Sequence, residues 1–217
     1  SQVVAAAMLS LYIVGLKGDR DREFISNEIR QLSKLPSALR KTFSHRDDIR
    51  AVAQRLAATR TYWAVVGSGP NKASADEIRI KLSELCYRTI SSDFVEDKKH
   101  IDLSAEPLII VCAAGSRPGV LDDIIKDTAI FRAHKAIPVV IADEGEDRFS
   151  HYAAAVIPVP QTAEHFGPVV NTFAGHLWGY YAALAINEGS RMLHAFREEI
   201  RNEIAECRQR NLDVFEI

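Results

Sequence analysis

The chain has 217 residues, of which 47% are hydrophobic and 26% charged, and its formal net charge is −2. These values are typical of a globular protein and exclude the disordered, collagen-like and coiled-coil classes. Charges of both signs are mixed along the chain without a long basic block, so no nucleic-acid partner is expected. A chain of this length forms one large domain or two small ones.

The three cysteines, Cys86, Cys112 and Cys207, are odd in number and lack CxxC spacing. A disulfide framework or a zinc site is therefore not expected, and the pattern favours the reducing cytoplasm. No cluster of His, Asp and Glu indicates a metal site, and no cofactor is predicted. The longest apolar run, residues 3–16, is too short to cross a bilayer and lacks a basic leader, so no membrane partner is expected. Because the sequence starts within an apparent helix, we expect it to be part of a longer protein.

The first 60 residues are predicted to be all helical. The pattern indicates residues 2–17, a helix capped by Asp19 or Asp21 that ends near Lys34, residues 37–43 with Pro36 at their first position, and residues 47–58. The first of these helices is apolar on most of its surface, so we expect it to be buried on more than one side.

From Thr61 onward the pattern changes to alternating strands and helices. Strands are predicted over residues 61–67, 107–114, 137–142 and 153–159, and helices over residues 76–85, 120–135, 165–186 and 191–210. Gly189 is expected to end the third of these helices. Pro138 and Pro158 are expected at a strand start or on a sheet edge. The predicted fold is a doubly wound α/β sandwich with four or five parallel strands. The predicted parts are a helical preface (residues 1–60), the α/β domain (61–190) and a charged helix or tail (191–217).

Two glycine-containing loops follow predicted strands and are candidate ligand sites. Gly67, Ser68 and Gly69 follow the first strand, and their backbone N–H groups could contact a sugar oxygen or phosphate at a helix N-terminus. Ser116 and Arg117 follow the second strand, and Arg117 could reach an anion. The alternatives are a plain tight turn for the first loop and a solvent-exposed turn for the second.

These elements resemble the sugar isomerase (SIS) family, and within it the second SIS subdomain of isomerising glutamine–fructose-6-phosphate aminotransferases. The resemblance rests on the order of elements, the glycine turn, and a helix in which Glu77, Lys81, Leu82 and Glu84 match the family's motif. It implies that Glu84 moves a proton between the first two sugar carbons, that Lys81 assists, and that His100 opens the sugar ring. An SIS-type sheet of about five strands is implied as the fold.

The same residues also have simpler interpretations. Lys81 and Glu84 are one helical turn apart and can form a surface ion pair that contributes a few tenths of a kcal/mol. His100 can be a solvated loop histidine. Trp63 and Trp178 are interpreted as core residues, and His165 and His176 as packed rather than as ligands.

Two functional hypotheses follow. The first is the isomerase part of an aminotransferase-like enzyme that converts a ketose phosphate to an aldose phosphate in amino-sugar synthesis, with the isolated fragment inactive. The expected partners are a phosphosugar of the fructose 6-phosphate or glucosamine 6-phosphate class, a second copy in a homodimer, and missing upstream SIS and amidotransferase domains. The second hypothesis is a non-catalytic SIS module that binds a phosphosugar or mediates dimerisation. It is favoured by residues 191–217, which lack the family's Schiff-base lysine.

Overall fold

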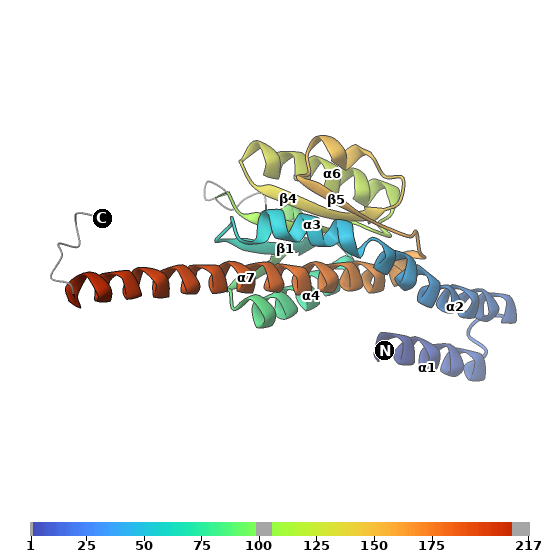
Figure 1. Cartoon of the computed structure of the whole chain (residues 1–217). Helices are drawn as coiled ribbons and strands as arrows, with labels where there is room; N and C mark the ends of the chain where they lie inside the picture. The colour runs from blue at the N-terminus through green and yellow to red at the C-terminus, as the bar shows by residue number, and fades with distance from the viewer. Residues whose placement is uncertain (1, 99–105, 210–217) are drawn as a thin grey trace.

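Five parallel strands form the sheet of this protein, whose computed structural model describes residues 2–98 and 106–209. The strand order is β2-β1-β3-β4-β5 (Figure 1). The strands are β1 (Trp63–Gly67), β2 (Ile90–Asp93), β3 (Leu108–Cys112), β4 (Ile137–Asp143) and β5 (Ala155–Val159). All neighbouring strands pair in parallel, which confirms the predicted fold class.

The central strands are apolar because helices cover both faces of the sheet. Every residue of β1 and β3 is buried, as expected for strands of an α/β sheet. Pro138 occupies the second position of β4 and Pro158 lies on β5 at the sheet edge, as predicted. The edge strand β2 was not predicted, because only one of its four residues is apolar.

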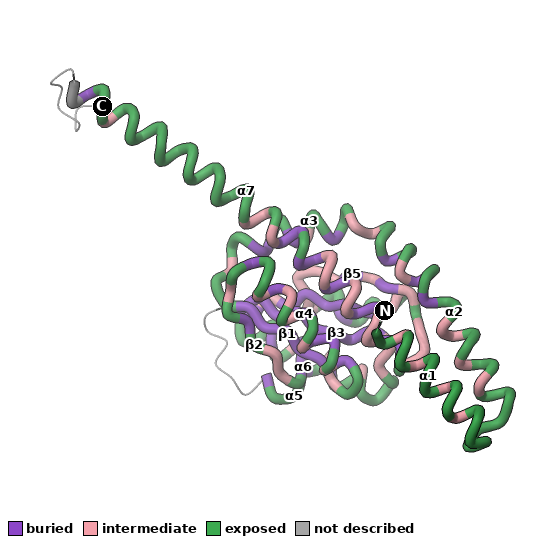
Figure 2. Tube along the Cα trace, turned by 90° about the horizontal axis from the view of Figure 1, so that it is seen from below, coloured by how far each residue is buried: buried purple, intermediate pink, exposed green. Residues whose placement is uncertain are grey.

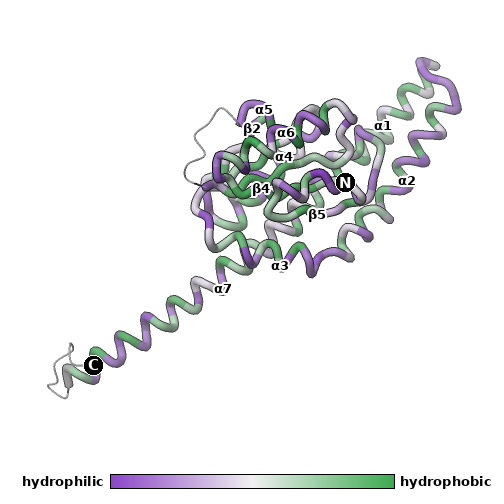
Figure 3. The backbone as a smooth tube through the Cα atoms, turned by 90° about the horizontal axis from the view of Figure 1, so that it is seen from above, coloured by the Kyte–Doolittle hydropathy of each residue, from purple (hydrophilic) through white to green (hydrophobic). Residues whose placement is uncertain are grey.

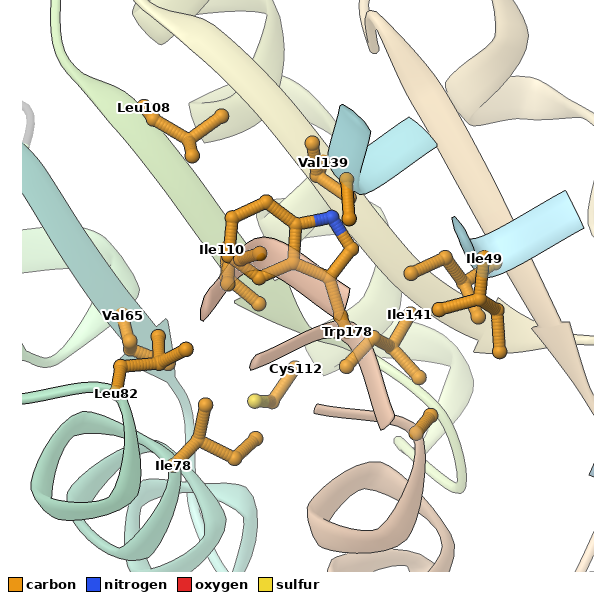
Figure 4. Close-up of a cluster of buried hydrophobic side chains, with 14 of the residues drawn as sticks. Ile49, Val65, Ile78, Leu82, Leu108, Ile110, Cys112, Val139, Ile141 and Trp178 are labelled. Atoms are coloured by element: carbon orange, nitrogen blue, oxygen red, sulfur yellow. The ribbon is translucent and has the colours of Figure 1, made fainter. Parts of the chain in front are cut away.

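Helices α3 (Arg46–Ala57), α4 (Asn71–Cys86) and α7 (Gly167–Gln209) pack on one face of the sheet. Trp178 of α7 fills the centre of this layer (Figure 4). Its ring meets that of Trp63 edge-to-face, with the ring centroids 5.3 Å apart. The prediction that both tryptophans are core residues is confirmed. The opposite face is covered by α5 (Val95–Lys98), α6 (Pro118–Ala133) and the 3-10 turn η1 (Arg148–His151). A second 3-10 turn, η2 (Glu164–Phe166), leads into α7.

Two predicted helix boundaries are wrong. Pro36 does not open a new helix but lies inside α2 (Arg22–Ser44), between the buried residues Leu35 and Ala38. At the start of α2, Asp21 rather than Asp19 is the cap, and its Oδ1 accepts a hydrogen bond from the backbone N–H of Phe24 at 2.7 Å. Gly189 does not end the predicted helix either, because α7 continues through it to Gln209.

Helix α1 (Gln2–Lys17) forms over the predicted range but has no buried residue. It lies against α2 at one end of the molecule, and its surface is apolar and exposed (Figures 2 and 3). We expected α1 to be buried on more than one side, but the described part of the chain does not bury it. At the opposite end, α7 extends beyond the sheet as an exposed helix (Figure 1). Across residues 2–98 and 106–209, no helix combines the length and apolar character needed to span a membrane.

Candidate functional site

The loops that follow β1 and β3 meet where the strand order reverses. The chain places β2 on one side of β1 and β3 on the other, and ligands of open α/β sheets bind at this switch point. The loops enclose a cavity of about 350 Å³, here named the loop pocket. Four residues predicted to bind substrate line it together, namely Ser68, Gly69, Ser116 and Arg117. The fifth, Gly67, is the last residue of β1, next to the pocket.

A buried pair of asparagine side chains joins the two loops. Asn71, the first residue of α4, donates from Nδ2 to the backbone oxygen of Ala114 at 2.9 Å and to Ser116 Oγ at 3.3 Å. Asn171 of α7 donates from Nδ2 to Asn71 Oδ1 at 3.0 Å. It also donates to the backbone oxygens of Ala114 and Gly167, both at 3.0 Å. Asn171 Oδ1 is buried and has no hydrogen-bond partner among the described residues, but the donors of both asparagines are paired. These hydrogen bonds hold the floor of the loop pocket in place.

The backbone after β3 is fixed by a second set of contacts. Gly115 has φ +71°, and its N–H donates to the two carboxylate oxygens of Asp143 at 3.1 and 3.2 Å. A Cβ on Gly115 would lie 2.9 Å from the Cα of Gly167, so only glycine fits there. Burial raises the pKa of Asp143, and the hydrogen bond from Gly115 partly opposes this shift. These constraints on Gly115 therefore determine where the loop places the next two residues, Ser116 and Arg117.

Carboxylates already contact two of the polar groups of the loop pocket. Arg117 Nε lies 2.6 Å from Glu164 Oε2, which raises the pKa of the guanidinium. Ser68 Oγ donates to Glu96 Oε2 at 3.1 Å. Helix α6 begins with Pro118, which has no backbone N–H, and it has no side-chain cap. The next two N–H groups, of Gly119 and Val120, are therefore the ones available to a ligand. An anion bound here would compete with Glu164 for Arg117.

Lys81 and Glu84 do not reach the loop pocket. Lys81 Nζ and Glu84 Oε2 form an ion pair of 2.7 Å on α4, and 58% of the Glu84 side chain is exposed. Contact with Glu84 raises the pKa of Lys81. Ten residues separate Lys81 from Asn71, a helical rise of about 15 Å. Within the described residues, Lys81 and Glu84 therefore lie apart from the predicted substrate-binding residues at the loop pocket. Glu84 is also not buried. The third predicted catalytic residue, His100, lies outside the described residues.

A further histidine lies on the same side of α4. His176 Nε2, from α7, lies 3.4 Å from Glu77 Oε1. Burial lowers the pKa of His176, Lys81 lowers it further, and Glu77 opposes the shift. Glu77, Lys81 and Glu84 follow one face of α4 at spacings of four and three residues. Sequence reasoning interpreted His176 only as a packed residue, because the partner that makes it notable comes from a distant segment of the chain.

The other histidine considered from the sequence, His165, has a different environment. Its Nε2 lies 2.7 Å from Glu28 Oε2 of α2, and 52% of its side chain is exposed. The preceding residue, Glu164, lines the loop pocket, but the His165 imidazole itself is paired with α2 and is distant from Glu77, Lys81 and Glu84 on α4. His165 therefore serves as a useful comparison for His176.

Known proteins resemble this chain in sequence and in fold, although no family model matches it. The isomerising glutamine–fructose-6-phosphate aminotransferase of Streptomyces coelicolor is 29% identical over 177 residues, which cover 79% of this chain and 29% of that protein. The C-terminal domain of glucosamine-fructose-6-phosphate aminotransferase from Francisella tularensis has a TM-score of 0.76 at 18% identity, covering 86% of this chain and 52% of that one. The sugar isomerase domain of an RpiR transcription factor from Sphaerobacter thermophilus has a TM-score of 0.59 at 16% identity, with coverages of 80% and 97%.

The aminotransferase relatives are longer than this chain, which spans 29% of the Streptomyces coelicolor protein. At these identities, the two solved structures support the fold alone. The sequence match and the fold agree with each other, and both agree with the family resemblance found from the sequence. The chain therefore has an SIS-type α/β fold and resembles the isomerising glutamine–fructose-6-phosphate aminotransferases.

Proposed function

We propose that this chain is a phosphosugar-binding SIS module and that the loop pocket holds the phosphate group. One observation carries the proposal: two hydroxyls, a guanidinium and the N-terminus of α6 surround one cavity at the switch point of the sheet. Guanidinium groups and helix N-termini are common phosphate-binding elements. The names of the similar proteins, which include a sugar isomerase domain, support the same ligand class.

Calorimetric titration of the 217-residue chain with fructose 6-phosphate and glucosamine 6-phosphate tests this proposal. Arg117→Ala should weaken binding roughly tenfold to a hundredfold, because a hydrogen bond to a charged group contributes about 1.5–3 kcal/mol. Arg201→Ala is the matched control, since Arg201 is also exposed and forms a 2.8 Å ion pair, with Glu198, far along α7. Equal affinities of the two variants would exclude the loop pocket as the phosphate site.

A second function, ketose–aldose isomerisation, is favoured by three ionisable residues along one face of α4, namely Glu77, Lys81 and Glu84. In this role Glu84 would take a proton from one sugar carbon and return it to the adjacent carbon, with Lys81 stabilising the developing charge. The exposed position of Glu84 is consistent with a site completed by an upstream domain or by a second copy. Isomerase turnover by the full-length protein tests this role: Glu84→Gln should abolish it, whereas unchanged turnover would remove Glu84 from the mechanism.

If Glu84→Gln has no effect while phosphosugar binding persists, the module is a non-catalytic binding or dimerisation domain. Glu198→Gln provides the control, because Glu198 forms a similar exposed ion pair on α7. Cytoplasmic location, a homodimer, and upstream SIS and amidotransferase domains remain predictions of the sequence. Size measurement of the purified chain in solution checks the predicted homodimer.

A further inference from the structure

A second cavity lies between α4 and α7, and residues 2–4 of α1 and Leu39 of α2 complete its lining. It has a volume of about 500 Å³, here named the interhelical cavity, and shares no lining residue with the loop pocket. This volume is within the usual range of small-molecule sites, roughly 300–1,000 Å³. The hydrogen bond from Ser74 Oγ to the backbone oxygen of Pro168, 2.9 Å long, joins the two helices at the wall of the cavity.

The interhelical cavity combines apolar walls with a pair of ionisable groups. Leu39, Pro168, Val169 and Phe173 supply apolar surface. Glu77 and His176 supply ionisable groups, and the neutral polar residues Gln2, Ser74 and Thr172 also line the cavity. A sugar ring has matching chemistry, because its C–H faces pack on apolar and aromatic surface and its hydroxyls both donate and accept hydrogen bonds. An aliphatic ligand would leave the two polar groups unpaired, and a compact anion would meet the Glu77 carboxylate.

His176 and Glu77 contact each other only weakly. His176 Nε2 is buried and lies 3.4 Å from Glu77 Oε1, which is at the long limit of a hydrogen bond and poorly aligned for one. Because buried polar atoms are normally well paired, a hydroxyl that hydrogen-bonds to both groups would improve this contact. A small movement of the Glu77 side chain, 48% of which is exposed, would let one hydroxyl donate to the carboxylate and pair with the imidazole.

We propose that the interhelical cavity binds the ring of a monosaccharide, with hydroxyls hydrogen-bonded to His176 and Glu77 and a C–H face packed on Phe173. The ring would then lie one to two helical turns from Lys81 and Glu84, which continue the same face of α4. The proposal depends on the proposed function only for the class of ligand, because the residues of the loop pocket have no part in this site.

NMR of the 217-residue chain with isotope-labelled histidine tests the proposal, and His176→Gln assigns the His176 signals among those of the seven histidines. Fructose and fructose 6-phosphate should each shift the His176 signals saturably, whereas inorganic phosphate should not. The signals of His194, which is exposed on the part of α7 beyond the sheet, should stay unchanged. In calorimetry, Glu77→Gln and His176→Gln should each weaken fructose binding roughly fivefold to tenfold, and His165→Gln should have no effect.

The Arg117→Ala variant separates this inference from the proposed function. Saturable His176 shifts that persist in Arg117→Ala support the interhelical cavity whether or not the loop pocket binds phosphate. Shifts that disappear in Arg117→Ala would overturn the separate site, because they would originate in the loop pocket. Phosphosugar binding without any His176 shift would also overturn the inference while leaving the loop pocket in place. The absence of any fructose-dependent shift in the wild type would overturn it as well.

Discussion

Replacing Gly67 with alanine tests whether this glycine is required by packing or only by a ligand. Gly67 ends β1, and the first turn of α4 folds back directly over it. A Cβ at this position would lie 2.6 Å from the carbonyl carbon of Asn71, closer still to its oxygen, and 3.0 Å from the backbone nitrogen of Lys72. These are backbone atoms, so no change of side-chain rotamer can relieve the clash. The first turn of α4 would have to move away from the sheet.

The expected cost follows from two contributions. Overpacking in a buried site costs about 1–3 kcal/mol. Displacing Asn71 also breaks its buried hydrogen bonds to the second loop, each of which contributes about 1 kcal/mol. We therefore expect Gly67→Ala to lower the free energy of unfolding by about 3–5 kcal/mol, a large share of the roughly 5–15 kcal/mol that stabilises a typical domain.

Two other glycines provide matched controls because an added Cβ would meet nothing within 4 Å at either of them. Gly69 has φ +55°, so Gly69→Ala should cost only about 1–2 kcal/mol for the left-handed conformation. Gly119 lies in the first turn of α6, and Gly119→Ala should be neutral or stabilise by up to about 1 kcal/mol. Urea unfolding measures all three variants, and Gly67→Ala should lower the midpoint by about 1 M or more. Equal midpoints for Gly67→Ala and Gly69→Ala would refute the contact between β1 and α4.

Three further predictions concern buried polar groups. Asn171→Leu leaves Asn71 Oδ1 without its donor, while the oxygen of Ala114 keeps its hydrogen bond from Asn71. The variant should destabilise the fold by about 1–3 kcal/mol in urea unfolding, and an unchanged midpoint would contradict the network. Burial raises the pKa of Asp143, so the wild type should lose stability relative to Asp143→Asn as the pH rises above the ordinary value of 3.8; a stability difference that is constant between about pH 4 and about pH 7 would contradict this. Burial raises the pKa of Cys86 to about 11 and raises that of Cys112 as well. A thiol reagent at about pH 8 should therefore label both of these cysteines only on unfolding. Rapid labelling of Cys86 or Cys112 in the native protein would contradict the prediction.

The sheet was largely predictable because its strands are buried on both faces. Such strands are continuous apolar runs, and the runs at β1 and β3 are recognisable without knowledge of the partner strands. The sequence of β2 contains two serines and an aspartate, so its extended conformation depends on pairing with β1, where Trp63 is opposite Ile90. Edge strands of this kind lack a local signal, and the number of strands was accordingly predicted only as four or five.

The wrong helix boundaries have the same origin, since local signals were weighed without tertiary contacts. A proline normally interrupts a helix, but α2 continues past Pro36 because Leu35 and Ala38 are buried on either side of it. A glycine ends a helix when it adopts a left-handed conformation. Gly189 remains helical within α7, and a helical glycine costs only about 1 kcal/mol.

The candidate site was predictable only where one loop carries its own signal. Glycine turns after strands marked both walls of the loop pocket, and the parallel register that sets Gly67 opposite Cys112 brings those turns together. The asparagine network has no comparable signal, because Asn71 and Asn171 are 100 positions apart in the chain. The same limitation applies to His176, which gains significance only from its contact with Glu77 on another helix.

Helices α4 and α7 connect the two proposed sites, because both begin at the loop pocket and both then line the interhelical cavity. Their separation is set by glycine: a Cβ on Gly179 would lie 2.7 Å from Leu82 Cδ2, and one on Gly175 would lie 3.1 Å from Ile78 Cγ2 and closer to the rest of that side chain. Interiors packed this tightly shift as units rather than deform gradually. The close contact of the two helices therefore holds Glu77 on α4 and His176 on α7 at a fixed separation, whether or not the loop pocket is occupied. The two proposed sites are distinct in their lining residues and share one tightly packed pair of helices.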